Sequence, residues 1–323
     1  MTRKVMKTIN VFLVLLLLSS LLLATGCNRS PNETKEKEGN NPPKVPDILE
    51  EMEIHVLEIM YDIDSIKGIS ITMMEKNQEA SPKEADLEME TGGDVETEIK
   101  LKPKEEEEKD TQKKMERNIE KSSVLIPLLQ QDEIEGTTAD LKEPPEDMEE
   151  IWFQINGEVE KLHRQWNVLE ADLRDVKIPL ENIDKFEETL TQASLLVMEE
   201  KVEDSLMIFN ELTQYLGEFR NFFTTKVPGE VYKMKYHIRH SVFLASLDEY
   251  EKAKDHIEKT RELKNGLQKD LIEKDADHVV EKFDLSIEDL KKQLELQELD
   301  LIQTDGAIVI KNIVLIKEAF QGS

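Results

Sequence analysis

The feature that most constrains the fold is a helical pattern of apolar residues that runs from residue 147 to the end of the chain. Apolar side chains recur there at intervals of three and four residues, which places them along one stripe of an α-helix. A helix cannot bury such a stripe alone, so the stripes of neighbouring helices must face each other. We therefore expect an all-α fold in which helical hairpins pack as a bundle or short solenoid, with residues 147–323 forming about seven helices.

The pattern in this region repeats after 48 to 49 residues. The first stripe comprises Phe186, Leu190, Ala193 and Val197, then Met234, Ile238, Ser241 and Ala245, and then Phe283, Ile287, Leu290 and Leu294. The second stripe comprises Val202, Ser205, Phe209, Leu212, Leu216 and Phe219, then Tyr250, Ala253, Ile257, Thr260, Lys264 and Leu267, and then Leu299, Ile302, Gly306, Val309, Ile313 and Ile316. Each copy predicts a helix, a tight turn and a second helix, with turns near residues 200–201, 248–249 and 297–298. Thr260, Lys264 and Gly306 interrupt the apolar pattern.

An earlier stripe of the same spacing runs from Trp152 to Leu169 and predicts one more helix before the first hairpin. Trp152 and Trp166 lie two heptads apart on it and are expected to anchor the core rather than to bind a ligand. Phe219, Phe222 and Phe223 lie at a predicted helix end. They would either cap the core or form an exposed contact patch.

Residues 243–253, with the sequence Phe-Leu-Ala-Ser-Leu-Asp-Glu-Tyr-Glu-Lys-Ala, resemble the helix pair of tetratricopeptide repeats. Residues 195–209 resemble it more loosely. The resemblance implies helical hairpins that present a binding surface. The period of that family is about 34 residues, shorter than the spacing found here, and its Trp and Gly positions are absent.

The N-terminus has the three parts of a secretory signal. Arg3, Lys4 and Lys7 form a positive segment, residues 11–24 are almost entirely apolar, and residues 24–27 read Ala-Thr-Gly-Cys. The apolar run is shorter than the roughly 20 residues that a membrane-spanning helix needs, which favours a cleaved signal. The alternative is an uncleaved N-terminal anchor.

The sequence Ala24-Thr25-Gly26-Cys27 resembles the lipobox of bacterial lipoproteins, with Ala24 where that family usually has Leu. The resemblance implies that residues 1–26 are a signal peptide, that cleavage separates Gly26 from Cys27, and that the Cys27 sulfur carries a diacylglyceryl group. We therefore expect an extracytoplasmic protein that its N-terminal lipid anchors to the cell membrane. Cys27 is the only cysteine, so no disulfide supports the fold.

Acidic residues outnumber basic residues 70 to 42, which gives a net charge of −28. Phosphate backbones and anionic lipid headgroups repel such a chain, so we expect no nucleic-acid partner. The same repulsion indicates that a lipid rather than a basic patch holds the protein at the membrane. Solubility is the explanation that we favour for the excess of acidic residues, and storage of cations is the alternative.

The residues between the signal and the C-terminal region divide into three parts. Residues 27–45 are rich in Asn, Pro, Lys and Glu and predict a flexible tether, whereas residues 46–76 have the apolar spacing of a helix. Residues 77–146 are acidic and of low complexity, so we expect a disordered linker. Within that linker, residues 111–131 could form one short helix, which Pro127 interrupts.

Candidate catalytic motifs are missing from the sequence. Neither a Gly-x-Ser-x-Gly motif nor a phosphate-binding glycine loop occurs, and the only cysteine is assigned to the lipid. We therefore expect a non-enzymatic protein that needs no cofactor.

Three pairs of residues place two metal-ligand side chains on one helical face: His55 with Glu58, His237 with His240, and His278 with Glu281. The His-x-x-Glu pairs resemble a motif of imelysin-like extracytoplasmic helical lipoproteins, some of which are linked to iron. Acidic residues make up about a fifth of the chain, so such pairs also arise by chance, and we expect no metal site.

The hypothesis that the sequence favours is therefore a membrane-anchored helical module that binds a protein or peptide partner. The alternative is a helical bundle that binds a metal or another small ligand. The two differ in whether the candidate histidines converge in the fold.

Overall fold

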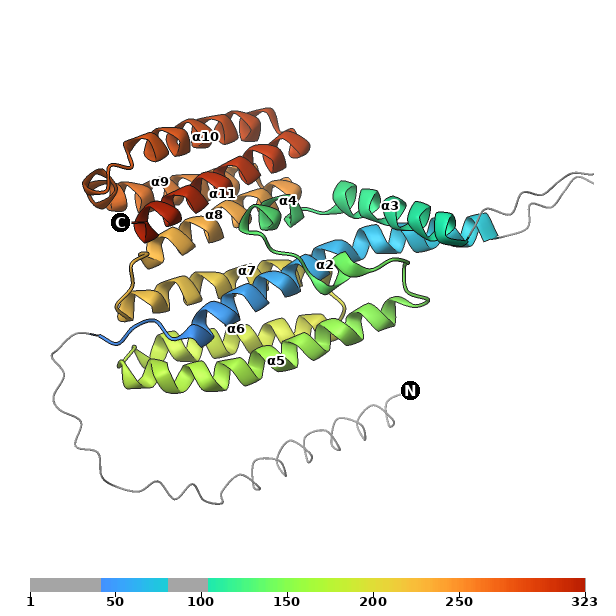
Figure 1. The fold of residues 1–323 in the computed structure, drawn as a ribbon, viewed down its shortest axis with the longest axis horizontal. Helices are drawn as coiled ribbons and strands as arrows, with labels where there is room; N and C mark the ends of the chain where they lie inside the picture. The colour runs from blue at the N-terminus through green and yellow to red at the C-terminus, as the bar shows by residue number, and fades with distance from the viewer. Residues whose placement is uncertain (1–41, 81–103, 323) are drawn as a thin grey trace, which may run out of the picture. The chain divides into compact units, whose positions relative to one another are not determined.

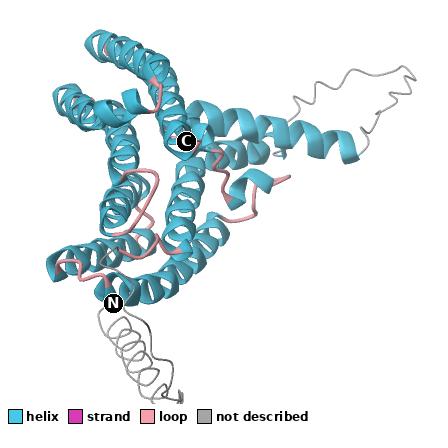
Figure 2. Ribbon diagram, turned by 60° about the vertical axis from the view of Figure 1, so that its left-hand side comes forward, coloured by secondary structure: helices cyan, strands magenta, loops and turns pink. Residues whose placement is uncertain are grey.

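The computed structural model describes residues 42–80 and 104–322, which fold almost entirely as α-helices (Figure 1). The helices are α2 (Asp47–Ala80), α3 (Lys104–Ser122), α4 (Ile126–Leu129), α5 (Met148–Asp175), α6 (Leu180–Met198), α7 (Val202–Phe219), α8 (Gly229–Ser246), α9 (Tyr250–Glu273), α10 (Asp277–Leu296) and α11 (Leu299–Gln321). Short 3-10 turns are η1 (Gln130–Asp132), η2 (Thr137–Asp140) and η3 (Arg220–Phe222). Figure 2 shows helices joined by loops, without a strand in the described residues, so the all-α prediction is confirmed.

Seven α-helices, α5 to α11, lie in the described part of residues 147–323, as expected. Consecutive helices pack side by side, so that α6 with α7, α8 with α9, and α10 with α11 form the three predicted hairpins (Figure 1). Helix α11 also returns to pack against α8. The second and third hairpins therefore share a core around α8, which is buried on most of its surface.

The predicted seam between the hairpin helices is confirmed by burial. Every position of the two stripes is buried except Val202, Tyr250 and Leu299, which are partly buried at helix starts. The three residues that interrupt the apolar pattern are buried for other reasons. Thr260 donates a hydrogen bond to the His256 carbonyl (2.9 Å), and Lys264 pairs with Asp284 (2.9 Å). A Cβ atom on Gly306 would lie 2.7 Å from Val242 Cγ2, so glycine allows α11 to approach α8.

Each hairpin turns at one residue in the left-handed backbone region. These residues are Glu200, Asp248 and Gln297, with φ between 58° and 61°, and all three lie at the predicted turns. At the first turn, the Lys201 amide donates to the Leu196 carbonyl and the Glu200 amide to the Val197 carbonyl, both at 3.0 Å. This pair of bonds is the Schellman arrangement that ends a helix and satisfies its last carbonyl groups.

Helix α2 extends the predicted helix at residues 46–76 by four residues and packs against α5 and α7. Gly68 lies inside this helix. A Cβ atom at this position would lie 2.4 Å from the backbone of Ile119 in α3. Gly68 therefore marks a close approach between α2 and α3 and not a helix end.

The structure corrects the limits of the predicted linker and tether. Residues 104–146, the larger part of the predicted linker at 77–146, contain α3, α4, η1 and η2. Several of their side chains belong to the core: Leu125, Ile126, Leu128, Leu129 and Ile134. At the end of the predicted tether, Thr224 donates hydrogen bonds to the carbonyls of Pro43 (2.7 Å) and Pro42 (2.6 Å). The last residues before α2 are therefore fixed to the loop that follows η3.

Candidate functional site

The segment from α3 to α5 is held in place by two buried carboxylates of α2. Asp64 accepts hydrogen bonds from the backbone amides of Val124 (2.9 Å), Leu125 (2.6 Å) and Ile126 (2.8 Å). Burial raises the pKa of Asp64 to about 6, and these three bonds oppose that shift. The carboxylate thus replaces water as the acceptor for three amides that lead into α4.

The second carboxylate, Asp62, fixes the other end of the segment. It accepts hydrogen bonds from the Thr137 hydroxyl (2.7 Å), the Thr138 hydroxyl (2.8 Å) and the Thr138 amide (2.9 Å). Gly136 allows this contact, because a Cβ atom there would lie 2.1 Å from Asp62 Oδ1. Residues 124–138 consequently arch over α2 and are attached to it at both ends.

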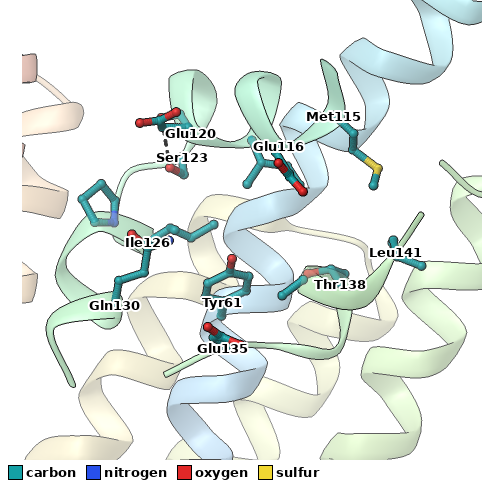
Figure 3. A pocket seen from close by; sticks show the side chains of 13 residues that line it. Tyr61, Met115, Glu116, Glu120, Ser123, Ile126, Gln130, Glu135, Thr138 and Leu141 are labelled. Carbon is teal, nitrogen blue, oxygen red and sulfur yellow. Dashed lines mark hydrogen bonds between the residues drawn. The ribbon is translucent and has the colours of Figure 1, made fainter. Parts of the chain in front are cut away.

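Between this arch and α3 lies a cleft of about 490 Å³ (Figure 3). The floor of the cleft is buried and combines apolar and hydroxyl side chains: Tyr61, Met115, Ile119, Ser123, Ile126 and Thr138. Figure 3 shows the Tyr61 ring near the centre, with its hydroxyl directed toward α3. The volume lies in the range of sites that bind small molecules.

The rim of the cleft is acidic. Glu116 and Glu120 of α3 and Glu135 from the arch are exposed and line the opening, and no described lysine, arginine or histidine lines the cleft. Burial raises the pKa of Tyr61, and the negative charges of Glu135, Asp62 and Asp64 raise it further. The phenol therefore stays neutral, and the site offers an apolar floor beneath three carboxylates.

The six candidate metal ligands lie in three separate places. His55 and Glu58 are on α2, where His55 contacts Glu158 (2.6 Å) and Gln165 (2.7 Å) of α5. His237 and His240 are on α8 and face α9, whereas His278 and Glu281 are exposed on α10. Throughout the described residues, no group of three or more His, Asp or Glu side chains is arranged to hold a metal ion.

The structure adds one histidine that the sequence pairs missed. His256 of α9 lies against both histidines of α8, with His237 Nδ1 and His256 Nδ1 3.0 Å apart and the His240 and His256 rings stacked at 4.3 Å. Burial, together with the nearby positive charge of Lys259, lowers the pKa of His237 and His240 to about 4 and that of His256 to about 3. We call these three residues the histidine trio.

The histidine trio is expected to make the fold sensitive to acid. In the unfolded chain these residues titrate near pH 6.5, whereas in the folded state they stay neutral to about pH 4. Between these values the unfolded state binds more protons, so stability is lost as the pH falls from 7 to 5. Allowing for partial exposure, we expect each histidine to lower the free energy of unfolding by about 1 kcal/mol over this interval.

The His256→Gln variant should lose less stability between pH 7 and pH 5 than the wild type in urea unfolding. The variant His278→Gln, outside the trio, should match the wild type, and equal slopes for all three proteins would contradict the account.

The aromatic residues that the sequence analysis identified pack into the core or against it. Trp166 stacks on Phe186 at 4.3 Å between ring centres and lies 6.3 Å from Phe219. Phe219 and Phe223 are buried and Phe222 is partly buried against the same core. These phenylalanines therefore cap the core, and the contact-patch alternative does not apply.

Comparisons with known proteins found no relative of this chain. No protein-family model matches the chain, and neither the curated proteins nor the solved structures contain a match. Across the described residues, no helix combines the length and apolarity needed to cross a membrane. Gly26 and Cys27, the predicted cleavage and lipidation sites, lie outside the described residues.

Proposed function

We propose that the chain is a non-enzymatic, lipid-anchored extracytoplasmic protein that binds a basic segment of a protein or peptide partner in the cleft between α3 and the arch. The observation that supports this most is the pairing of an apolar floor with a rim of three carboxylates. A lysine or arginine side chain matches both, because its aliphatic stem can lie on the floor while its charge meets the rim. The net charge of −28 adds long-range attraction for such a partner.

The anchor in this proposal follows from the resemblance of residues 24–27 to a lipobox. Two acyl chains hold a protein at a bilayer firmly, whereas one chain gives marginal binding. The cleft lies in residues 61–141, and the anchor would keep it at the membrane surface. The partner would then be a membrane or cell-envelope protein with an accessible basic segment.

The binding proposal can be tested with a fluorescent peptide of alternating lysine and leucine and a glutamate–leucine peptide as its counterpart. Fluorescence anisotropy at physiological salt should show saturable binding of the lysine peptide alone. The triple variant Glu116→Gln, Glu120→Gln, Glu135→Gln should weaken that binding roughly tenfold or more, because it removes the three rim charges.

A matched control separates the cleft from the general charge of the protein. Asp184, Glu187 and Glu188 are exposed on α6, and changing them to Asn, Gln and Gln removes the same charge elsewhere. This control should alter the affinity by less than about twofold. Equal losses in both triple variants would contradict a specific site.

The lipid anchor can be tested in cells that express the protein. The Cys27→Ser variant should remain unprocessed or be released, and a mature membrane-bound Cys27→Ser protein would contradict the anchor.

A further inference from the structure

Three buried cations meet where η3 and α8 pack against α2 and η1. Arg220, Lys235 and Arg239 are 2%, 5% and 1% exposed. Burying a cation is costly unless a negative charge or several hydrogen-bond acceptors compensate for the lost water. In a chain as acidic as this one, three buried bases at one place call for a specific explanation.

The resident acids compensate for these cations only in part. Glu53 accepts a hydrogen bond from Arg220 Nη2 at 2.6 Å, and Glu50 accepts a longer one from Nη1 at 3.4 Å. Asp132 serves two cations, since it contacts Lys235 Nζ and lies 3.6 Å from Arg239 Nη1. Burial lowers the pKa of Lys235 although Asp132 attracts its proton, so the ammonium group remains poorly stabilised.

These groups surround a cavity of about 100 Å³. Its walls include Arg220, Lys235 and Asp132, three apolar side chains, Ile54, Leu57 and Ile134, and the ring of Tyr232. Lys317 of α11 also lines it, with Nζ 5.5 Å from the Tyr232 ring centre, and Arg220 lies 3.9 Å over the same ring. Arg220 Nε is buried and has no hydrogen-bond partner among the described residues. Arg239 Nη1 and Asp132 Oδ2, which are 3.6 Å apart, are likewise buried without a hydrogen bond.

The charges around the cavity leave a single positive charge without a counterpart. Among the described residues, three cations, Arg220, Lys235 and Lys317, line the cavity with three acids, Glu50, Glu53 and Asp132. Arg239 is not part of the lining, but it lies 3.6 Å from Asp132 and adds the fourth positive charge to the group. One negative charge would balance the group, whereas a dianion such as phosphate would be repelled by the three resident carboxylates. Guanidinium and ammonium donors bind carboxylates through short charge-assisted hydrogen bonds.

We propose that this cavity is a second binding site, which takes one carboxylate group carried on a short aliphatic chain. The carboxylate would lie between Lys317, Lys235 and Arg220, and its aliphatic part would contact Ile54 and Leu57. The ligand is either a small free carboxylic acid or the C-terminus of a peptide. The site is separate from the acidic cleft, so the proposal stands without the function proposed above.

The test uses the purified full chain in detergent and follows its thermal unfolding while butyrate is added at constant ionic strength. Butyrate should raise the melting temperature in a saturable way, whereas neutral butyramide and inorganic phosphate should not. In Lys317→Ala the butyrate dissociation constant should rise roughly tenfold, because one charged donor is lost. Lys311→Ala, an exposed lysine of the same helix, should match the wild type.

Two further ligands separate the possible sources of the carboxylate. N-acetyl-dialanine binding more tightly than butyrate would support a peptide C-terminus, and weaker binding would support a small free acid; in both cases its amide should not bind. The proposal is overturned if butyrate gives no saturable shift, if butyramide or phosphate acts equally, or if Lys317→Ala binds butyrate as the wild type does.

Discussion

Replacement of Asp132 by asparagine is expected to lower the free energy of unfolding by about 3–5 kcal/mol, as is typical when one partner of a buried ion pair is removed. The Asp132 side chain is 6% exposed and faces Lys235 and Arg239. Asparagine keeps the size of the side chain but removes its charge, which leaves two buried cations without their shared counter-ion. Urea unfolding at neutral pH measures the loss.

Two further variants separate this effect from a general change in charge. Asp140→Asn removes one exposed acid close to Asp132 in the sequence and should change stability by less than about 0.5 kcal/mol. Adding Lys235→Met to Asp132→Asn should recover about half of the loss, because one of the two stranded cations is gone. A loss in Asp132→Asn no larger than in Asp140→Asn would show that the ion pairs contribute little to the fold.

Two acids of α2 explain why the sequence could not predict most of residues 104–146. Asp62 and Asp64 are of a residue type that is usually exposed, yet both are buried and bind backbone amides some 60 to 76 residues away. Hydrogen bonds of this kind leave no local period in the sequence. The local signals supported only one possible short helix at residues 111–131, interrupted by Pro127, where the structure has the end of α3 and α4.

Residues 147–323 were predictable because their burial follows a period. Apart from α8, which is buried on most of its surface, the helices there hide a stripe against a neighbour in the chain, so their register follows from spacing. The histidine trio shows the limit of this approach. Pairs such as His237 and His240 are visible on one helix, whereas His256 joins them only through the pairing of α8 with α9. The predicted hairpin would have revealed it, because His256 precedes the seam residue Ile257.

The second large loss of stability is expected from a change at Phe209, which lies on the stripe that sets the register of the first hairpin. Phe209 is fully buried on α7, which packs against α6, α8 and α2. Phe209→Ala removes most of a fully buried side chain from a helix that packs against three others, and the surrounding backbone can relax only in part. We expect a loss of about 3–5 kcal/mol in the free energy of unfolding, measured by urea denaturation. That is a large share of the 5–15 kcal/mol that is typical of a folded protein.

The seam account requires that the cost depends on position and not on residue type. Leu195 is also apolar and lies on α6, but its exposed fraction is 55%, so Leu195→Ala should cost less than about 1 kcal/mol. Lys201→Ala, at an exposed position between α6 and α7, should be as mild. If Phe209→Ala were no more costly than these two variants, α7 would not present this face to its neighbours. The stripes that define all three hairpins would then be in the wrong register, because Phe209 occupies the same position in its copy as Ile257 and Gly306 do in theirs.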